Sequence, residues 1–157
     1  MKSHHTHHLI VDGHSVIHAW EDLRKLHVRR QAAAREELLQ RLSVLHDQTE
    51  YAVTVVFDGR GEGKPELSRE PGGMQVAYSV KDQTADAVIE RMVAGFRTPD
   101  RIVVVTNDNA ERMTVESFGA MVLDADALED LLDHARTDQG GQLEKIKNKA
   151  RGFGRRY

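Results

Sequence analysis

Residues 101–108 read RIVVVTND, an apolar, β-branched run that ends abruptly in polar residues. β-Branched residues favour strands, and a short apolar run with polar ends is typical of a strand buried on both faces. Residues 9–11 (LIV) and residues 51–57 (YAVTVVF) follow the same plan and lead directly into Asp12 and Asp58. The sequence therefore predicts three buried strands, each followed by acidic residues.

Segments with helical spacing of apolar residues separate these strands. Helices are predicted at 15–26, 32–45, 84–96, 110–118 and 125–135, further strands at 74–80 and 121–123, and a long exposed loop at 59–73. Ser15 is a suitable N-cap for the first helix, and Gly119 is a suitable stop for the fourth. Helices that alternate with strands in this way predict an α/β fold with a mostly parallel central sheet.

The composition indicates one globular domain. A chain of 157 residues buries one core, and 39% apolar with 30% charged residues excludes a disordered chain. The apolar runs are far shorter than the roughly 20 residues of a membrane helix, and no secretory signal is visible. The chain has no cysteine, which excludes disulfides, a thiolate zinc site and a cysteine nucleophile. We therefore expect a cytoplasmic protein without a membrane segment.

Charge is unevenly distributed along the chain. The net charge is −3, but residues 142–157 carry +5, which leaves −8 for the remainder. We predict a His-rich leader or tag remnant at 1–8, the folded domain at 9–136 and a basic tail at 137–157. The tail is either an arm that contacts phosphates or a solvated segment without a partner. Its six cations are Lys145, Lys147, Lys149, Arg151, Arg155 and Arg156.

The acids at the strand ends suggest a metal site. Asp12, Asp58 and Asp108 follow three predicted strands, while Asp82 (a suitable N-cap) and Asp86 lie at the start of the helix at 84–96. The carboxyl ends of parallel strands share one edge of a sheet, so these acids would converge there. Clustered carboxylates suit Mg²⁺ or Mn²⁺, the cations that assist phosphodiester hydrolysis. The alternative interpretation is a set of unconnected turn and cap residues.

Several other motifs remain open to two interpretations. His14 and His18 are four residues apart and are either exposed helix residues or ligands of a metal or phosphate. Trp20 is either a core residue or a platform on which a base stacks. Arg60 and Lys64 lie in a Gly-rich segment that lacks the P-loop pattern, because Pro65 follows the lysine. They are either solvated or bound to an RNA backbone.

The order of the motifs resembles that of the YacP-like NYN-domain family. Residues 12–17 (DGHSVI), 57–59 (FDG), 82–86 (DQTAD) and 106–108 (TND) match stretches that in the family approximate DGYN, FDG, ETAD and T-S/N-D. The resemblance covers about residues 8–136. It implies a PIN-like three-layer α/β/α fold and a divalent-metal-dependent endoribonuclease, associated in some members with the ribosome and mRNA.

The resemblance also implies roles for individual residues. Asp12, Asp86 and Asp108 would be the catalytic carboxylates that hold Mg²⁺ or Mn²⁺, with Asp82 as a further ligand. The residues expected to bind the RNA substrate are Ser15, Asn107, Asp58, Arg60, Lys64, Lys145, Lys147 and Lys149. We expect hydrolysis of single-stranded RNA by a metal-activated water.

Two residues depart from the family pattern. Ser15 replaces the asparagine of the first motif, and Gln83 replaces the glutamate of the third. They favour an alternative: a catalytically weakened domain that binds RNA or the ribosome. A phosphatase of the HAD type is a weaker rival, because His14 stands where its second aspartate is required.

Overall fold

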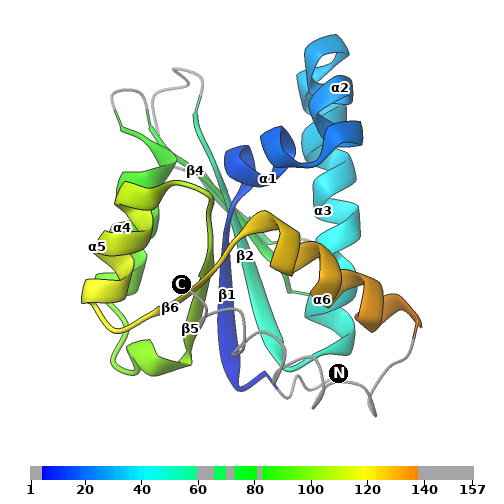
Figure 1. The fold of residues 1–157 in the computed structure, drawn as a ribbon. Helices are drawn as coiled ribbons and strands as arrows, with labels where there is room; N and C mark the ends of the chain where they lie inside the picture. Colours follow the sequence, from blue (N-terminus) through cyan, green and yellow to red (C-terminus); the bar gives the residue numbers. More distant parts are fainter. Residues whose placement is uncertain (1–4, 60–65, 70–72, 81–82, 138–157) are drawn as a thin grey trace.

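Strand β1 (His7–Asp12) lies near the middle of a six-stranded sheet in the computed structural model (Figure 1). The structure describes residues 5–59, 66–69, 73–80 and 83–137. The strand order is β3-β4-β2-β1-β5-β6, with five parallel strands and an antiparallel edge strand, β3. The predicted, mostly parallel sheet is confirmed. The other strands are β2 (Tyr51–Phe57), β3 (Glu66–Arg69), β4 (Gln75–Tyr78), β5 (Ile102–Val105) and β6 (Met121–Leu123).

Two strand predictions need correction. Strand β1 begins at His7, because the backbones of His7 and His8 pair with β2; the leader predicted at 1–8 therefore extends too far. Strand β3 lies inside the loop predicted at 59–73 and pairs with β4. The paired residues are close in sequence, as Arg69 pairs with Gln75, but the Gly- and Pro-rich composition of this segment favoured a loop.

Helices cover both faces of the sheet, which gives the three-layer α/β/α arrangement (Figure 1). Helices α1, α2, α3 and α6 lie on one face, and α4 and α5 lie on the other. None of the described helices combines the length and hydrophobicity that a membrane crossing requires. The helices are α1 (Gly13–Ala19), α2 (Glu21–Arg29), α3 (Gln31–Gln48), α4 (Ala85–Ala94), α5 (Asn109–Ser117) and α6 (Ala125–Thr137), with a 3₁₀ turn at Pro99–Arg101.

The helix predicted at 15–26 is two helices, because the chain turns at Trp20. Trp20 has an extended backbone (φ −86°, ψ 120°), and its indole Nε1 donates to the Ala125 carbonyl at 3.1 Å. The ring is only 5% exposed and belongs to the core, so the interpretation as a base-stacking platform is wrong. A buried indole requires a partner for its N–H, and that requirement fixes the chain direction here.

Two predicted helix caps are also wrong. Asp12 caps α1 by accepting the Ser15 amide, whereas Ser15 was the expected cap. Thr84 caps α4 by accepting the Ala87 amide, whereas Asp82 was the expected cap. Both caps lie next to the acids of the candidate site and help to fix where those acids point. Gly119 stops α5 as predicted, with the positive φ of 101° that glycine tolerates.

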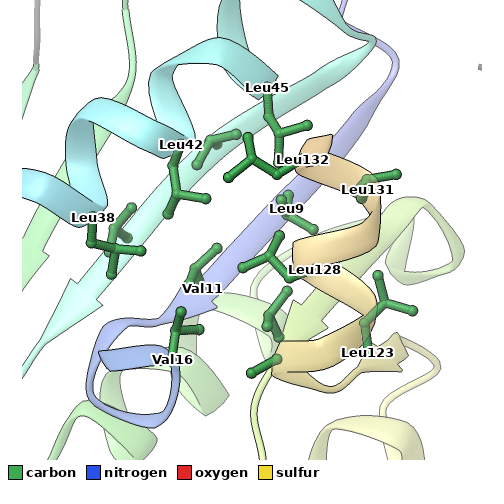
Figure 2. Close-up of a cluster of buried hydrophobic side chains, with 14 of the residues drawn as sticks. Leu9, Val11, Val16, Leu38, Leu42, Leu45, Leu123, Leu128, Leu131 and Leu132 are labelled. Carbon is green, nitrogen blue, oxygen red and sulfur yellow. The ribbon is translucent and has the colours of Figure 1, made fainter. Parts of the chain in front are cut away.

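Alternation along β1 divides the interior into two cores. Leu9 and Val11 face the larger core, where leucines of α3 and α6 interdigitate above the strand (Figure 2). Ile10 faces the smaller core under α4 and α5. Successive side chains of a strand point to opposite faces, so Asp12 follows Ile10 toward α4 and α5.

Candidate active site

A pocket of about 540 Å³ opens at the carboxyl edge of the sheet, beside the ends of β1, β2 and β5. It brings together acids that are widely separated in sequence, together with two histidines of α1. Within the described part of the chain, no lysine or arginine lines it. Among the described lining residues, therefore, no lysine or arginine offsets the negative charge of the pocket. The lining includes Asp12, His14, Ser15, His18, Asp58, Asp86, Asn107 and Asp108.

Three carboxylates converge at this edge of the sheet. One oxygen each of Asp12, Asp86 and Glu111 lies within 4.8 Å of the others. Asp12 comes from the end of β1, Asp86 from the first turn of α4 and Glu111 from the first turn of α5. Since the strand alternation sends Asp12 toward α4 and α5, all three acids meet on one face of the sheet.

Glu111 is the most unusual of the three acids. Its side chain is 1% exposed, and its Oε2 has no hydrogen-bond partner among the residues that the structure describes. Burial, followed by the adjacent Asp86 and Asp12 carboxyls, raises the pKa of Glu111 to about 9, although the Thr106 hydroxyl opposes the shift. Without a cation, Glu111 therefore holds a proton at neutral pH.

Asp12 is 4% exposed, and burial also raises its pKa. The nearby Asp86 charge acts in the same direction, while hydrogen bonds from Ser15 act in the opposite one. A cation among the three acids would reverse both pKa shifts, since it favours the ionised form of every carboxylate.

Two hydroxyls orient the buried carboxylates. Ser15 Oγ donates to Asp12 Oδ2 at 3.0 Å, and Thr106 Oγ1 donates to Glu111 Oε1 at 3.1 Å. Thr106 Oγ1 also lies 3.3 Å from Asp12 Oδ2, but its single proton serves one acceptor at a time. Ser15 thus supports the site directly, even though the family pattern has asparagine at this position.

The other predicted acids hold the surrounding backbone. Asp108 lines the pocket and caps α5, where its Oδ1 accepts the Glu111 amide at 3.1 Å. Asp58 Oδ1 accepts the Ala85 amide at 2.7 Å and so ties the end of β2 to the start of α4. Both carboxylates line the pocket, but neither belongs to the close group of three.

Asn107 has a similar supporting contact. Its Oδ1 accepts the Ala125 amide at 2.9 Å and anchors the start of α6. Its backbone N–H lies 3.4 Å from Ser15 Oγ, which links it to the hydroxyl that orients Asp12. The remaining predicted site residues lie outside the described residues or have no described side chain: Asp82, Arg60, Lys64, Lys145, Lys147 and Lys149.

Glu111 was missed by the sequence analysis, although a signal was present. It lies four residues before Val115, and these are the two buried residues of α5. An acid on the apolar stripe of a helix indicates either a buried pair or a ligand. Its position three residues after the Asp108 cap is also that of the glutamate in a capping box, so the local sequence alone does not single it out as a ligand.

The donor set fits a divalent cation. Three converging carboxylates supply the hard oxygen ligands that Mg²⁺ and Mn²⁺ prefer. Among the described residues, the buried Oε2 of Glu111 lacks a hydrogen-bonding counterpart. A bound cation would supply that counterpart and offset the unbalanced negative charge.

A parallel sheet with helices on both faces and clustered acids at its carboxyl edge defines a PIN-like, nuclease-type domain. The profile of the YacP-like NYN domain matches residues 9–156, and the chain belongs to that family. Family membership indicates a nuclease-type, RNA-related domain.

Named relatives agree with this assignment. The chain is 29% identical over 114 residues to uncharacterized protein YacP of Bacillus subtilis (strain 168), covering 72% of this chain and 67% of that protein. It also resembles the crystal structure of Rae1 (YacP) from Bacillus subtilis, with a TM-score of 0.68 and 25% identity over 98% of this chain and 82% of that one. The W164L mutant of Rae1 gives a TM-score of 0.69 and 26% identity, covering 83% of this chain and 77% of that one.

Proposed function

We propose that this protein is a metal-dependent endoribonuclease that hydrolyses phosphodiester bonds in single-stranded RNA. The observation that carries the proposal is the group of three carboxylate oxygens within 4.8 Å, in which Glu111 has a buried, partnerless oxygen. Burying such a group without a counter-charge is unfavourable for folding. A ligand-binding role explains why the fold contains it.

Asp12, Asp86 and Glu111 are the residues that would hold the cation, and Asp108 at the pocket wall is a further proposed ligand. Bound Mg²⁺ or Mn²⁺ would neutralise phosphate charge and favour attack of water on phosphorus. Ser15 and Thr106 keep the carboxylates in place before substrate arrives. Such preorganisation lowers the reorganisation that the reaction itself requires.

The shape and charge of the pocket support a nucleic-acid substrate. The pocket is an open cleft at the edge of the sheet, so a flexible single strand of RNA can reach the carboxylates. An acidic cleft repels phosphates unless cations are bound, which makes RNA binding itself dependent on the metal. Association with mRNA or the ribosome is part of the same proposal and rests on family membership.

The basic residues of the tail are proposed to contact the RNA backbone. Deletion of residues 142–157 should then weaken RNA binding and reduce its salt dependence, since each phosphate contact on a single strand contributes a slope of about 0.7. Fluorescence anisotropy with a labelled RNA at several salt concentrations measures both quantities. An unchanged affinity and slope would remove the tail from the interface.

RNA cleavage tests the function directly. A mixed-sequence fluorescent RNA is incubated with the full chain and Mn²⁺, Mg²⁺ or EDTA, alongside Asp12→Asn and the exposed control Asp100→Asn. The proposal predicts cleavage with Mn²⁺ or Mg²⁺ that EDTA and Asp12→Asn abolish and Asp100→Asn preserves. Cleavage that persists in Asp12→Asn contradicts the site assignment. Binding without any cleavage favours the alternative of a catalytically weakened RNA-binding domain.

A further inference from the structure

Two histidines on α1 face each other at the wall of the pocket. His14 and His18 are one helical turn apart, and their Nε2 atoms are 3.2 Å from each other. Their ring centres are 4.5 Å apart, and both side chains are exposed. Both rings line the same pocket as Asp12 and Asp86.

The separation of the two nitrogens suits a shared cation. Two nitrogens bound at the usual 2.0–2.1 Å to a tetrahedral zinc ion lie about 3.3 Å apart. Histidines four residues apart on a helix can meet this requirement, because residues at this spacing lie on one face. In this structure the two Nε2 atoms are joined by a 3.2 Å hydrogen bond, so a metal would take the place of the proton between them with little movement of the rings.

A third histidine lies beside the pair. The ring of His27, on α2, is 5.3 Å from that of His18 and 5.9 Å from that of His14. The turn of the chain at Trp20 brings α2 back toward α1 and places the third ring there.

We propose that His14 and His18, with His27 beside them, bind a nitrogen-preferring divalent transition metal such as Zn²⁺ at the wall of the pocket. This site is separate from the carboxylate group, whose oxygen ligands prefer Mg²⁺ or Mn²⁺. The pocket would then hold two cation sites with different preferences. The proposal concerns metal binding by the histidines and does not require the nuclease activity.

Zinc titration tests the proposal on the full chain after treatment with EDTA. Isothermal titration calorimetry compares the unmodified protein with His14→Gln, His18→Gln and the control His134→Gln on α6. Loss of a residue that only hydrogen-bonds to a metal ligand lowers metal affinity about 10-fold to 100-fold. Loss of a ligand itself should therefore lower the zinc affinity at least about tenfold. The sequence has four further histidines at positions 4, 5, 7 and 8 that could compete for zinc, so the readout is the difference between variants.

Histidine ring nitrogen spectra locate the zinc. We expect the His14 and His18 resonances to shift with the first equivalents of Zn²⁺, both in the unmodified protein and in Asp12→Asn. We also expect the calorimetric signal of this site to disappear in His14→Gln and His18→Gln and to persist in His134→Gln. Unchanged zinc binding in both α1 variants, or zinc binding lost in Asp12→Asn but kept in His18→Gln, would overturn the proposal.

Discussion

Strand β1 contributes to two buried regions that differ in almost every physical respect. Leu9 and Val11 pack under the leucines of α3 and α6, in a region composed of apolar side chains (Figure 2). At the end of the same strand, Asp12 is 4% exposed and lies near Glu111, which is 1% exposed. Apolar burial stabilises the fold by about 25 cal/mol per Å². Burial of several carboxylates opposes folding unless protons or cations join them.

The comparison teaches that burial alone does not indicate a stabilising role. The leucines of the core and the carboxylates of Asp12 and Glu111 are all buried, yet mutations of the two regions should have opposite effects. Changes in the leucine region should lower stability and leave the chemistry of each folded molecule intact. Changes in the acidic site should remove the chemistry and leave stability unchanged or higher.

The largest expected effect is on cleavage, in Asp86→Asn. Loss of one carboxylate from the cation site should remove several kcal/mol of transition-state stabilisation, which corresponds to about a thousandfold or more in rate. Thermal unfolding without metal should show unchanged or higher stability, because a neutral amide replaces one of the clustered carboxylates. Single-turnover cleavage of a fluorescent RNA with Mn²⁺ measures the rate, and near-normal cleavage would remove Asp86 from the site.

The next largest effect is the loss of stability in Leu128→Ala. Leu128 is fully buried between α6 and the sheet, and such a truncation lowers the free energy of unfolding by about 2–5 kcal/mol. Urea unfolding measures the change, and the exposed Met113→Ala is the control, with an expected effect within about 0.5 kcal/mol. Cleavage per folded molecule should stay normal. A lower cleavage rate per folded molecule would contradict the assignment of stability to the leucine core and of chemistry to the acidic site.

A smaller effect of opposite sign is expected from Glu111→Gln. The folded-state pKa of Glu111 is raised to about 9, so the metal-free protein loses stability as pH rises from the ordinary value of 4.5 toward 9. Glutamine carries no charge, so at pH 7 the variant should be more stable than the unmodified protein by up to about 3 kcal/mol, with little difference near pH 4.

Calorimetric scans between pH 4 and pH 9 measure the difference in Tm between Glu111→Gln and the unmodified protein. For a domain of this size, each kcal/mol of stability corresponds to about 2–4 °C in Tm. Glu116→Gln, an exposed change on the same helix, serves as the matched control. A Glu111→Gln variant that is less stable at every pH would mean that the carboxylate stabilises the fold, contrary to the comparison.

The smallest effect is expected from Ser15→Ala. The hydroxyl donates to Asp12 Oδ2 at 3.0 Å, and a hydrogen bond of this kind contributes about 1 kcal/mol. Mn²⁺ affinity and the cleavage rate should each fall about three- to tenfold. The exposed Ser117→Ala should change neither quantity. If Ser15→Ala behaves like Ser117→Ala, the serine does not orient the carboxylate.

Elements with strong local patterns were predictable from the sequence. β-Branched runs gave the bounds of β2 and β6 as the structure has them, and the apolar stripe of residues 32–45 located most of α3. The split at Trp20 was not predictable, since it depends on a hydrogen bond to Ala125, 105 positions further along the chain. Strand β3 was missed for a different reason, because the Gly- and Pro-rich composition of residues 59–73 favoured a loop over a strand that pairs with β4.

The candidate site was predictable in part. Strand ends and the family motifs led to Asp12 and Asp86, which the structure brings together with Glu111. Asp108 was expected in the same group, but it caps α5 while lining the pocket. Which acid of an Asp-x-x-Glu sequence turns inward depends on the orientation of the helix against the sheet. That orientation is set by tertiary packing, which spacing in the sequence does not reveal.

The most direct test of the central claim is Mn²⁺ binding by the full chain, measured by isothermal titration calorimetry at pH 7.5. The account predicts that Mn²⁺ binds the unmodified protein with release of protons, because Glu111 must lose its proton to become a ligand. It also predicts that this binding and its proton release disappear in Asp12→Asn and in Glu111→Gln and persist in Asp100→Asn. Mn²⁺ binding that is unchanged in both site variants, or absent from the unmodified protein, would contradict a metal centre built from these carboxylates.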